Sequence, residues 1–287
     1  MRLSRPLGAG SAVLVTGASS GIGADTVREL SASGYRVFGS VRSQDDRGTV
    51  ERLGGEAVAL DVVDADSVAL ASREIERALE GEPLAGLVNN AGIAVAGPWE
   101  EIPEEDMRRA FEVNLFGAIR LTRAFLPSLR RARGRIVMVS SISARIASPF
   151  IGPYASSKSA LEAFCDSLRR ELIPFGVSVT SIQPGPVKTP IWGKVRAATV
   201  GRYLDSVYSR ALESFACETA RAEGHAIEVS RVSTSISAVL SARRPKTRIV
   251  VSRRARLIRL TGLMPDRLLD RIVTSRIHAR GDGADEA

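Results

Sequence analysis

A glycine-rich turn near the N-terminus connects a short apolar run to an amphipathic segment. The run Ala12–Val15 is entirely apolar, and apolar residues recur at helical spacing within 24–33. Between them lie Gly17, Gly21 and Gly23, in the spacing Gly-x-x-x-Gly-x-Gly. In the order strand, glycine turn and helix, backbone N–H groups and a helix N-terminus can hold a pyrophosphate. This unit favours an α/β fold that binds a nucleotide, although a glycine-rich turn can also be only a turn.

Each of the three glycines has a separate expected role in this unit. We expect Gly17 to permit the sharp turn, Gly21 to let a phosphate approach the backbone, and Gly23 to let the helix pack closely on the strand. The other loop residues that we expect to contact the nucleotide are Ser19, Ser20 and Ile22.

Apolar runs and amphipathic segments alternate along the rest of the chain. Further strands are predicted at Arg36–Val41, Ala57–Leu60, Leu84–Val88, Arg135–Ser140, Val177–Ile182 and Arg248–Val251. Helices are predicted at 43–54, 64–79 with Asp64 as N-cap, 104–131, 153–175 and 227–240. This alternation predicts one α/β domain over 1–252, a doubly wound, mostly parallel seven-stranded sheet of Rossmann type with helices on both faces and ligands at the carboxyl ends of its strands.

A tyrosine and a lysine lie four residues apart at the start of the helix predicted over 153–175. This spacing puts Tyr154 and Lys158 on the same helix face. A nearby ammonium group favours the phenolate, so we expect the pKa of the Tyr154 hydroxyl to be lowered enough for proton exchange near neutral pH. The same spacing also occurs where a helix carries one aromatic residue and one solvated cation, so the pair alone leaves both interpretations open.

Two further features complete a recognisable set. Thr16 precedes the glycine turn, and the strand predicted over 84–88 ends in Asn89-Asn90-Ala91-Gly92. With the glycine spacing and Tyr-x-x-x-Lys, this set resembles the compact short-chain dehydrogenase/reductase family, most closely its hydroxysteroid and retinol dehydrogenases. The resemblance is strongest over 11–189. It implies an oxidoreductase that interconverts an alcohol and its carbonyl by hydride transfer to or from a nicotinamide cofactor.

The resemblance also implies roles for four side chains. Tyr154 would give a proton to the carbonyl oxygen or take one from the alcohol, and Lys158 would lower the pKa of Tyr154 and bind the nicotinamide ribose. Ser141, thirteen residues before Tyr154, would fix the substrate oxygen, with Ser140 as a rival. Asn114 would form a local helix kink and hold a water that leads to Lys158.

Cofactor contacts are implied at three strand ends. Asp61 and the backbone of Val62 would contact the adenine, and the segment 90–92, comprising Asn90, Ala91 and Gly92, would line the cofactor. Pro184 and Gly185 would form the turn beside the nicotinamide, and Val187 and Thr189 would hold its carboxamide.

The residue after the second predicted strand bears on the choice of cofactor. An NAD-binding fold places an acidic residue at the position of Val41, and here the next residue is Arg42. A guanidinium offers forked donors to a 2′-phosphate, which predicts a preference for NADP(H) over NAD(H). The alternative is that Arg42 is a solvated loop charge in an arginine-rich chain.

Composition excludes several other kinds of site. Two cysteines and two histidines are too few and too scattered for a disulfide framework, and we expect no metal site. Of the net charge of +8, the segment 243–287 carries +7, with twelve basic and five acidic residues. No nucleic-acid motif accompanies this charge. We expect a cytoplasmic protein that acts on a lipophilic small molecule and forms a dimer or tetramer through the helices at 104–131 and 153–175, as the family does.

Two segments outside the core pattern allow more than one interpretation. The insert 190–224 contains Trp192, Tyr203, Tyr208 and Phe215, which could be core residues or part of the substrate lid that the family builds there. The basic, amphipathic extension 253–287 carries an apolar stripe of Leu268, Leu269, Ile272, Val273 and Ile277. We expect this stripe to pack on the domain or on a second subunit, with an anionic membrane surface as the alternative. The last residues, 281–287, are expected to be disordered.

Substrate contacts and rival functions complete the predictions. Ser143, Arg145, Pro149 and Phe150 are expected to form the near wall of the substrate pocket. A non-catalytic NADP(H)-binding sensor on the same fold is the main alternative, and a sugar-nucleotide epimerase is disfavoured by the glycine spacing.

Overall fold

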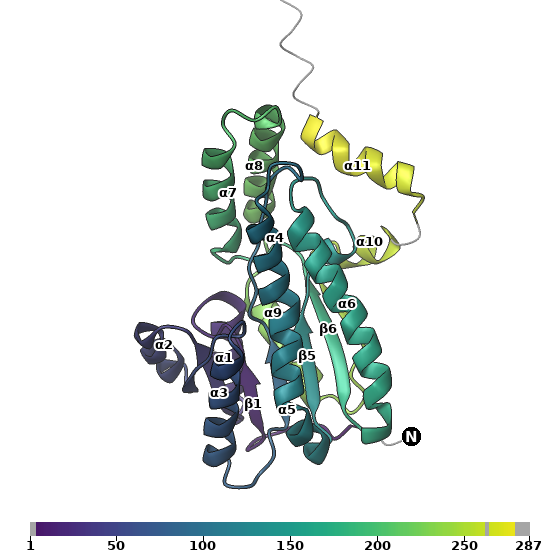
Figure 1. Cartoon of the computed structure of the whole chain (residues 1–287). Helices are drawn as coiled ribbons and strands as arrows, with labels where there is room; N and C mark the ends of the chain where they lie inside the picture. The colour runs from purple at the N-terminus through teal and green to yellow at the C-terminus, as the bar shows by residue number, and fades with distance from the viewer. Residues whose placement is uncertain (1–3, 262–263, 279–287) are drawn as a thin grey trace, which may run out of the picture.

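The computed structural model describes residues 4–261 and 264–278, which form a seven-stranded sheet between two layers of helices (Figure 1). Every pair of neighbouring strands is parallel, in the order β3-β2-β1-β4-β5-β6-β7. The strands are β1 (Ala12–Val15), β2 (Arg36–Val41), β3 (Glu56–Ala59), β4 (Gly86–Asn89), β5 (Arg135–Val139), β6 (Ser178–Pro184) and β7 (Arg248–Val251). This confirms the predicted sheet, with each strand end within two residues of its expected position.

Helices cover both faces of the sheet, which is why its central strands are buried on both sides. One layer consists of α3 (Ala65–Ala78), α5 (Ala118–Ala132) and α6 (Gly152–Leu172), and the other of α1 (Gly21–Ala32) and α9 (Ser230–Ser241). Successive residues of β1 point to opposite faces, so Leu14 packs with the first layer and Val13 with the second.

The strand order reverses at the centre of the sheet. From β1 the chain moves outward through β2 and β3, and it then returns to place β4 on the other side of β1. The helices that follow β1 and β4 therefore lie on opposite faces, and the loops at the ends of these strands diverge. In open parallel sheets such a point leaves a crevice at the carboxyl ends of the strands, where ligands bind.

The helix predicted over 104–131 is interrupted near its middle. It consists of α4 (Glu104–Phe111), a π-helical segment, η2 (Glu112–Gly117), and α5. The predicted N-cap at Asp64 is confirmed, because its Oδ1 accepts a hydrogen bond from the N–H of Asp66 at 2.9 Å. The other short elements before the insert are η1 (Gln44–Asp46), α2 (Arg47–Arg52), η3 (Ile142–Ala144) and η4 (Ile173–Phe175).

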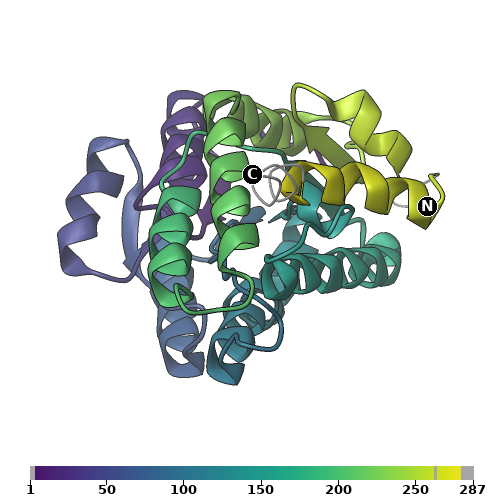
Figure 2. The same cartoon turned by 90° about the horizontal axis from the view of Figure 1, so that it is seen from above.

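The insert and the C-terminal extension are helical. The insert forms α7 (Ile191–Arg202) and α8 (Ser209–Gly224), and the extension forms α10 (Ala255–Leu260) and α11 (Asp266–His278). In Figure 2, which views the molecule from above, α11 lies across the end of the molecule. Among the described residues no helix is both long and apolar enough to span a bilayer. The segment 281–287, predicted to be disordered, lies outside the described residues.

A buried arginine joins the central sheet to the layer of α9. Arg135 on β5 is fully buried, and its guanidinium donates hydrogen bonds to the carbonyl oxygens of Arg5 at 3.1 Å, Val239 at 2.7 Å and Ala242. Val239 lies in the last turn of α9, where carbonyls lack intrahelical partners, and Ala242 directly follows that helix. Arg135 thus satisfies backbone groups that the fold would otherwise bury unpaired.

Candidate active site

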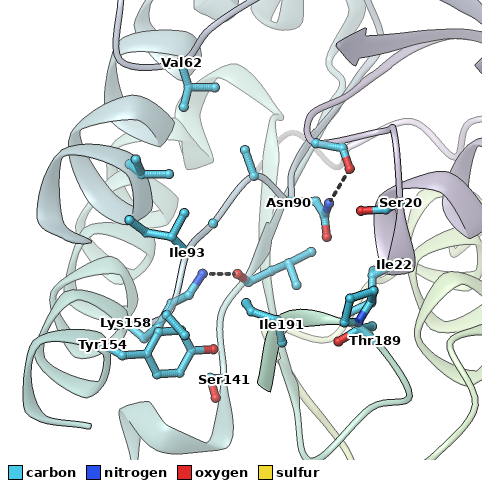
Figure 3. Close-up of a pocket in the computed structure, with 18 of the residues that line it drawn as sticks. Ser20, Ile22, Val62, Asn90, Ile93, Ser141, Tyr154, Lys158, Thr189 and Ile191 are labelled. Atoms are coloured by element: carbon cyan, nitrogen blue, oxygen red, sulfur yellow. Dashed lines mark hydrogen bonds between the residues drawn. The ribbon is translucent and has the colours of Figure 1, made fainter. Parts of the chain in front are cut away.

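A cleft of about 970 Å³ opens at the carboxyl ends of the strands. Residues that follow six of the seven strands line it, together with the start of α6 and of α7. Figure 3 shows Ser141, Tyr154 and Lys158 at one end of this cleft and Val62 at the other. All the predicted catalytic and cofactor-binding residues line the cleft except Gly23 and Asn114.

The glycine turn has the geometry that its sequence requires. Gly17 has a φ of +63°, which only glycine adopts readily, and its N–H donates to Ser40 Oγ at 3.0 Å. A Cβ atom at Gly23 would lie 2.0 Å from the carbonyl oxygen of Gly17. Gly23 therefore does not reach the cleft itself, but it lets α1 begin directly against the turn. The N-terminus of α1 then points its unpaired N–H groups toward the cleft, as in sites that bind a phosphate.

The ends of β1 and β4 are tied together beside this turn. Thr16 Oγ1 accepts hydrogen bonds from the N–H groups of Asn90 and Ala91, both at 2.9 Å. In return, Asn90 Nδ2 donates to the carbonyl oxygen of Thr16 at 2.8 Å. These bonds fix the floor of the cleft where the two strands separate.

Asn114 lies behind the cleft, inside the π-helical segment η2. Its Oδ1 accepts from the N–H of Ile93 at 2.8 Å, and its Nδ2 donates to the Ile93 carbonyl and to Ser157 Oγ, both at 2.9 Å. A Cβ atom at Gly92 would lie 3.1 Å from Asn114 Oδ1 and 3.3 Å from Lys158 Nζ. The predicted helix irregularity at Asn114 is thus confirmed, and the residue holds the segment after β4 close to Lys158.

Tyr154 and Ser141 meet at the inner end of the cleft (Figure 3). The Tyr154 side chain is only 8 % exposed, and this burial raises the pKa of its hydroxyl, while the neighbouring Ser141 hydroxyl acts in the opposite direction. The net direction is opposite to the lowering that the sequence predicts, because burial outweighs the other influences. Of the two serines at the end of β5, Ser141 is the one beside the tyrosine hydroxyl.

Lys158 is directed at the end of β5. Its Nζ donates to the Val139 carbonyl oxygen at 2.9 Å and lies 6.0 Å from the centre of the Tyr154 ring. Burial lowers the pKa of Lys158 to about 8, although the nearby Glu162 and Cys165 act to raise it. The ammonium group is therefore a buried cation between the Tyr154 ring and the end of β5.

The segment after β6 returns to the glycine turn. The N–H of Gly185 donates to the Val251 carbonyl at 3.0 Å, and Val187 forms a parallel bridge with Ile227. A Cβ atom at Gly21 would lie 3.2 Å from Thr189 Cγ2, so Thr189 faces the turn across the cleft. Pro184, Gly185, Val187 and Thr189 all line the cleft beside the start of α7.

The far end of the cleft is polar and cationic. Asp61 accepts from the N–H of Val63 at 3.1 Å and so supports the loop that carries Val62. Arg42 lines the cleft and is exposed. Arg108 and Arg109 of α4 also line it and were not predicted, because a basic pair on an amphipathic helix resembles an ordinary solvated face.

An apolar wall faces Tyr154. Trp192, at the start of α7, packs edge-on against the Tyr154 ring with 5.5 Å between ring centres. Ile93, Ala94 and Val195 line the same part of the cleft. Ile93, Ala94 and Val195 were not predicted as site residues. Trp192 in the insert was named either as a core residue or as part of a substrate lid.

The near wall predicted for the substrate pocket does not border this cleft. The four residues are not among those that line the cleft: Ser143, Arg145, Pro149 and Phe150. Arg145 Nε instead donates to Gln183 Oε1 at 2.6 Å, and the Phe150 ring packs edge-on against Tyr208 and Phe215. Phe150 thus packs against the apolar cluster that contains Tyr154, Val195 and Phe215, which the sequence spacing alone does not reveal.

Within the ranges 4–261 and 264–278, no three His, Cys, Asp or Glu side chains are grouped so that they could hold a metal ion.

Comparison with known proteins agrees with this architecture. Residues 11–199 match the family model "short chain dehydrogenase". The chain belongs to the short chain dehydrogenase family. It is 36 % identical over 268 residues to an NADPH-dependent 3-dehydrocapnine reductase from Ornithobacterium rhinotracheale, covering 90 % of this chain and 94 % of that protein. It is 31 % identical over 286 residues to human retinol dehydrogenase 5, covering 91 % and 87 %.

Solved structures of the family share the fold. A short chain dehydrogenase from Burkholderia cenocepacia J2315 in complex with NADP superimposes with a TM-score of 0.75 at 26 % identity, covering 92 % of this chain and 98 % of that one. Since relatives that match over most of this short chain dehydrogenase are reductases and dehydrogenases, the chain is an oxidoreductase.

Proposed function

We propose that this short chain dehydrogenase interconverts an alcohol and its carbonyl by hydride transfer with NADP(H), with Tyr154 as the acid and base. The observation that carries the proposal is the buried Tyr154 hydroxyl beside Ser141, at the inner end of a cleft that begins at the glycine turn. Proton transfer requires a titratable group within hydrogen-bond reach of the reacting oxygen, and here an oxygen between the two hydroxyls would be in reach of both.

The residues of the cleft fit a dinucleotide. The open cradle at Gly17 and the N-terminus of α1 suit a pyrophosphate, and a Cβ atom at Gly23 would abolish that cradle. The loop of Asp61 and Val62 at the far end suits the adenine, and Thr189 with the backbone of Val187 suits the carboxamide. When bound, the nicotinamide would supply the hydride acceptor or donor.

The chain's own residues would orient the substrate and move the proton. Ser141 would hold the substrate oxygen, and Tyr154 would exchange the proton with it. The buried ammonium group of Lys158 would bind the nicotinamide ribose and stabilise the phenolate while the proton is away. Asn114 would hold the segment after β4 close to Lys158 through its hydrogen bonds to the backbone of Ile93.

Cofactor and substrate preferences follow from the two ends of the cleft. Val41 stands where an acidic residue would repel a 2′-phosphate, and Arg42 follows it, which favours NADP(H); the relative named above is NADPH-dependent. The wall formed by Ile93, Ala94, Trp192 and Val195 favours a lipophilic substrate. In this proposal α7 and α8 act as the substrate lid on a single dehydrogenase domain.

A panel assay tests the proposal. Steroids, retinoids, aliphatic aldehydes and ketones would be screened with NADPH, and the matching alcohols with NADP+, by following absorbance of the reduced nicotinamide. We expect turnover for a lipophilic class, at least about 100-fold lower in Tyr154→Phe and nearly unchanged in Tyr35→Phe, a buried tyrosine of the opposite layer. Near-native turnover in Tyr154→Phe would contradict the mechanism, and tight NADPH binding without turnover would favour the non-catalytic alternative.

A further inference from the structure

The C-terminal extension presents uncovered apolar side chains. On α10, Leu257 and Leu260 are 57 % and 56 % exposed, and on α11, Leu268 and Ile272 are 47 % and 39 % exposed. The stripe on α11 was expected to pack on the domain or on a second subunit, and within the described chain none of its residues with described burial is buried. A monomer rarely leaves several neighbouring large apolar side chains in water unless they meet something.

Cations surround these apolar side chains. The exposed basic residues of this region are Arg253, Arg254, Arg256, Arg259, Arg267 and Arg271, against two exposed carboxylates, Asp266 and Asp270. None of the six guanidinium groups forms an ion pair with any other residue that the structure describes. We call the four apolar residues and these six arginines the tail surface.

The tail surface lies at the end of the molecule that contains the cleft. Helix α11 packs against α8. Figure 1 shows α7, α8 and α11 together at the end of the molecule that contains the carboxyl ends of the strands. The loop between α7 and α8 adds Leu204 and Val207, which are 65 % and 88 % exposed.

We propose that the tail surface docks on an anionic phospholipid membrane. A short amphipathic helix with leucines on one side and arginines around them can insert its apolar face at the headgroup boundary while its cations meet anionic lipids. A second copy of the chain fits less well, because a symmetric contact of this surface with itself would bring six arginines against six arginines. The net charge of the surface selects a negatively charged partner.

Vesicle co-flotation of the full chain tests the proposal without any need for turnover, so its outcome is independent of the proposed reaction. We expect the protein to float with vesicles of phosphatidylcholine containing about 30 % phosphatidylglycerol, and to stay behind with phosphatidylcholine alone. The charge reversal Arg256→Glu/Arg259→Glu/Arg267→Glu/Arg271→Glu should weaken binding by roughly tenfold or more, since each cation near an anionic surface contributes to binding.

Two matched variants separate the contributions. The control Arg73→Glu/Arg77→Glu/Arg123→Glu/Arg131→Glu makes the same change in net charge at positions of α3 and α5 away from the tail surface, and it should bind like wild type. The variant Leu257→Ser/Leu260→Ser/Leu268→Ser/Ile272→Ser keeps every arginine and should also lose binding. Circular dichroism and NADPH affinity would verify that each variant is folded.

Three outcomes would overturn the proposal. The first is that wild type does not float with the anionic vesicles. The second is that the serine variant binds as wild type does, which would mean that the apolar residues do not insert. The third is that the wild type does not bind vesicles and light scattering shows it to be a dimer, which the four-arginine charge-reversal variant dissociates. This surface would then be an interface between two copies of the chain.

Discussion

Arg248 on β7 donates from Nε to Oε2 of Glu162 on α6 at 2.7 Å, one helical turn beyond the catalytic candidate Lys158. Glu162 is largely buried and also accepts a hydrogen bond from Ser181 Oγ. Together these bonds hold the pKa of Glu162 below its usual range, even though burial acts to raise it. A buried carboxylate thus ties the helix that carries Tyr154 and Lys158 to the two last strands of the sheet.

Glu162→Gln tests what this carboxylate does for the helix. Removing the charge leaves Arg248 partly buried beside a neutral amide, and we expect a loss of about 2 kcal/mol in the free energy of unfolding, below the value for a fully buried pair because Arg248 is partly exposed. Because the folded pKa of Glu162 is lowered, its contribution is present above about pH 4–5 and fades as the pH falls through the folded value. Urea unfolding at pH 7 and at lower pH would measure this, with the exposed Glu171→Gln as control. A loss of the same size at every pH would contradict it.

Arg135→Met tests the buried arginine that joins β5 to α9. The methionine fills a similar volume but leaves the carbonyls of Arg5, Val239 and Ala242 without their donor. We expect unfolding free energy to fall by about 2–4 kcal/mol, since each unpaired buried acceptor costs roughly 1–3 kcal/mol and removal of the buried charge offsets part of that loss. The neighbour Arg133→Met, at an exposed position, should stay within about 0.5 kcal/mol of wild type. Equal urea midpoints for the two variants would refute this role.

Gly23→Ala tests the proposed pyrophosphate site at the Gly17 turn and the N-terminus of α1. Its Cβ would lie 2.0 Å from the Gly17 carbonyl oxygen, so the turn and the start of α1 must move apart. We expect a loss of about 1–3 kcal/mol in stability from this overpacking and at least about tenfold weaker NADPH binding by fluorescence titration. Gly201→Ala is a matched control in α7, because nothing lies within 4 Å of the position that its methyl group would take. Unchanged NADPH affinity in Gly23→Ala would place the cofactor elsewhere.

Local patterns in the sequence predicted much of this architecture. The strand ends, the turn at Gly17 and the shared face of Tyr154 and Lys158 depend on neighbours close in the chain, and the structure confirms them. The direction of the Tyr154 pKa was predicted wrongly, because it depends on how far the folded protein removes the hydroxyl from water.

Local sequence patterns could not predict the contacts between segments that are far apart in the chain. Arg135 looks like the first residue of a strand, yet its partners are 104 and 107 positions further along the chain and 130 positions before it. Likewise, Trp192 reaches Tyr154 only because the segment after β6 folds back over the cleft. The contact of Phe150 with Phe215 of α8 is likewise one between segments far apart in the chain.

Arg42→Ala tests the proposed cofactor preference. Loss of the guanidinium should weaken NADPH binding by roughly tenfold, as expected for a charge-assisted contact to the 2′-phosphate, and should leave NADH binding nearly unchanged. Isothermal titration with both cofactors would measure the ratio. Arg52→Ala, an exposed arginine of α2 that does not line the cleft, is the control. If Arg42→Ala changed neither affinity, Arg42 would be a solvated loop charge.

Lys158→Met separates function from stability at one residue. Burial lowers the pKa of Lys158 from 10.5 to about 8, so below pH 8 the folded protein holds a cation that the unfolded chain solvates better. Each pKa unit is about 1.4 kcal/mol, and the lost bond to the Val139 carbonyl offsets part of the gain, so we expect the variant to be about 1–2 kcal/mol more stable than wild type at pH 7. Because the folded pKa is the lower one, wild type recovers stability as the pH rises from about 8 toward 10.5, and the stability difference between the variant and wild type shrinks.

Urea unfolding at pH 7 and pH 9.5 would measure this trend, with the exposed Lys246→Met as control. A variant that is more stable yet inactive would show that the buried ammonium group is kept for the reaction, whereas a variant less stable at pH 7 would show that the cation supports the fold instead.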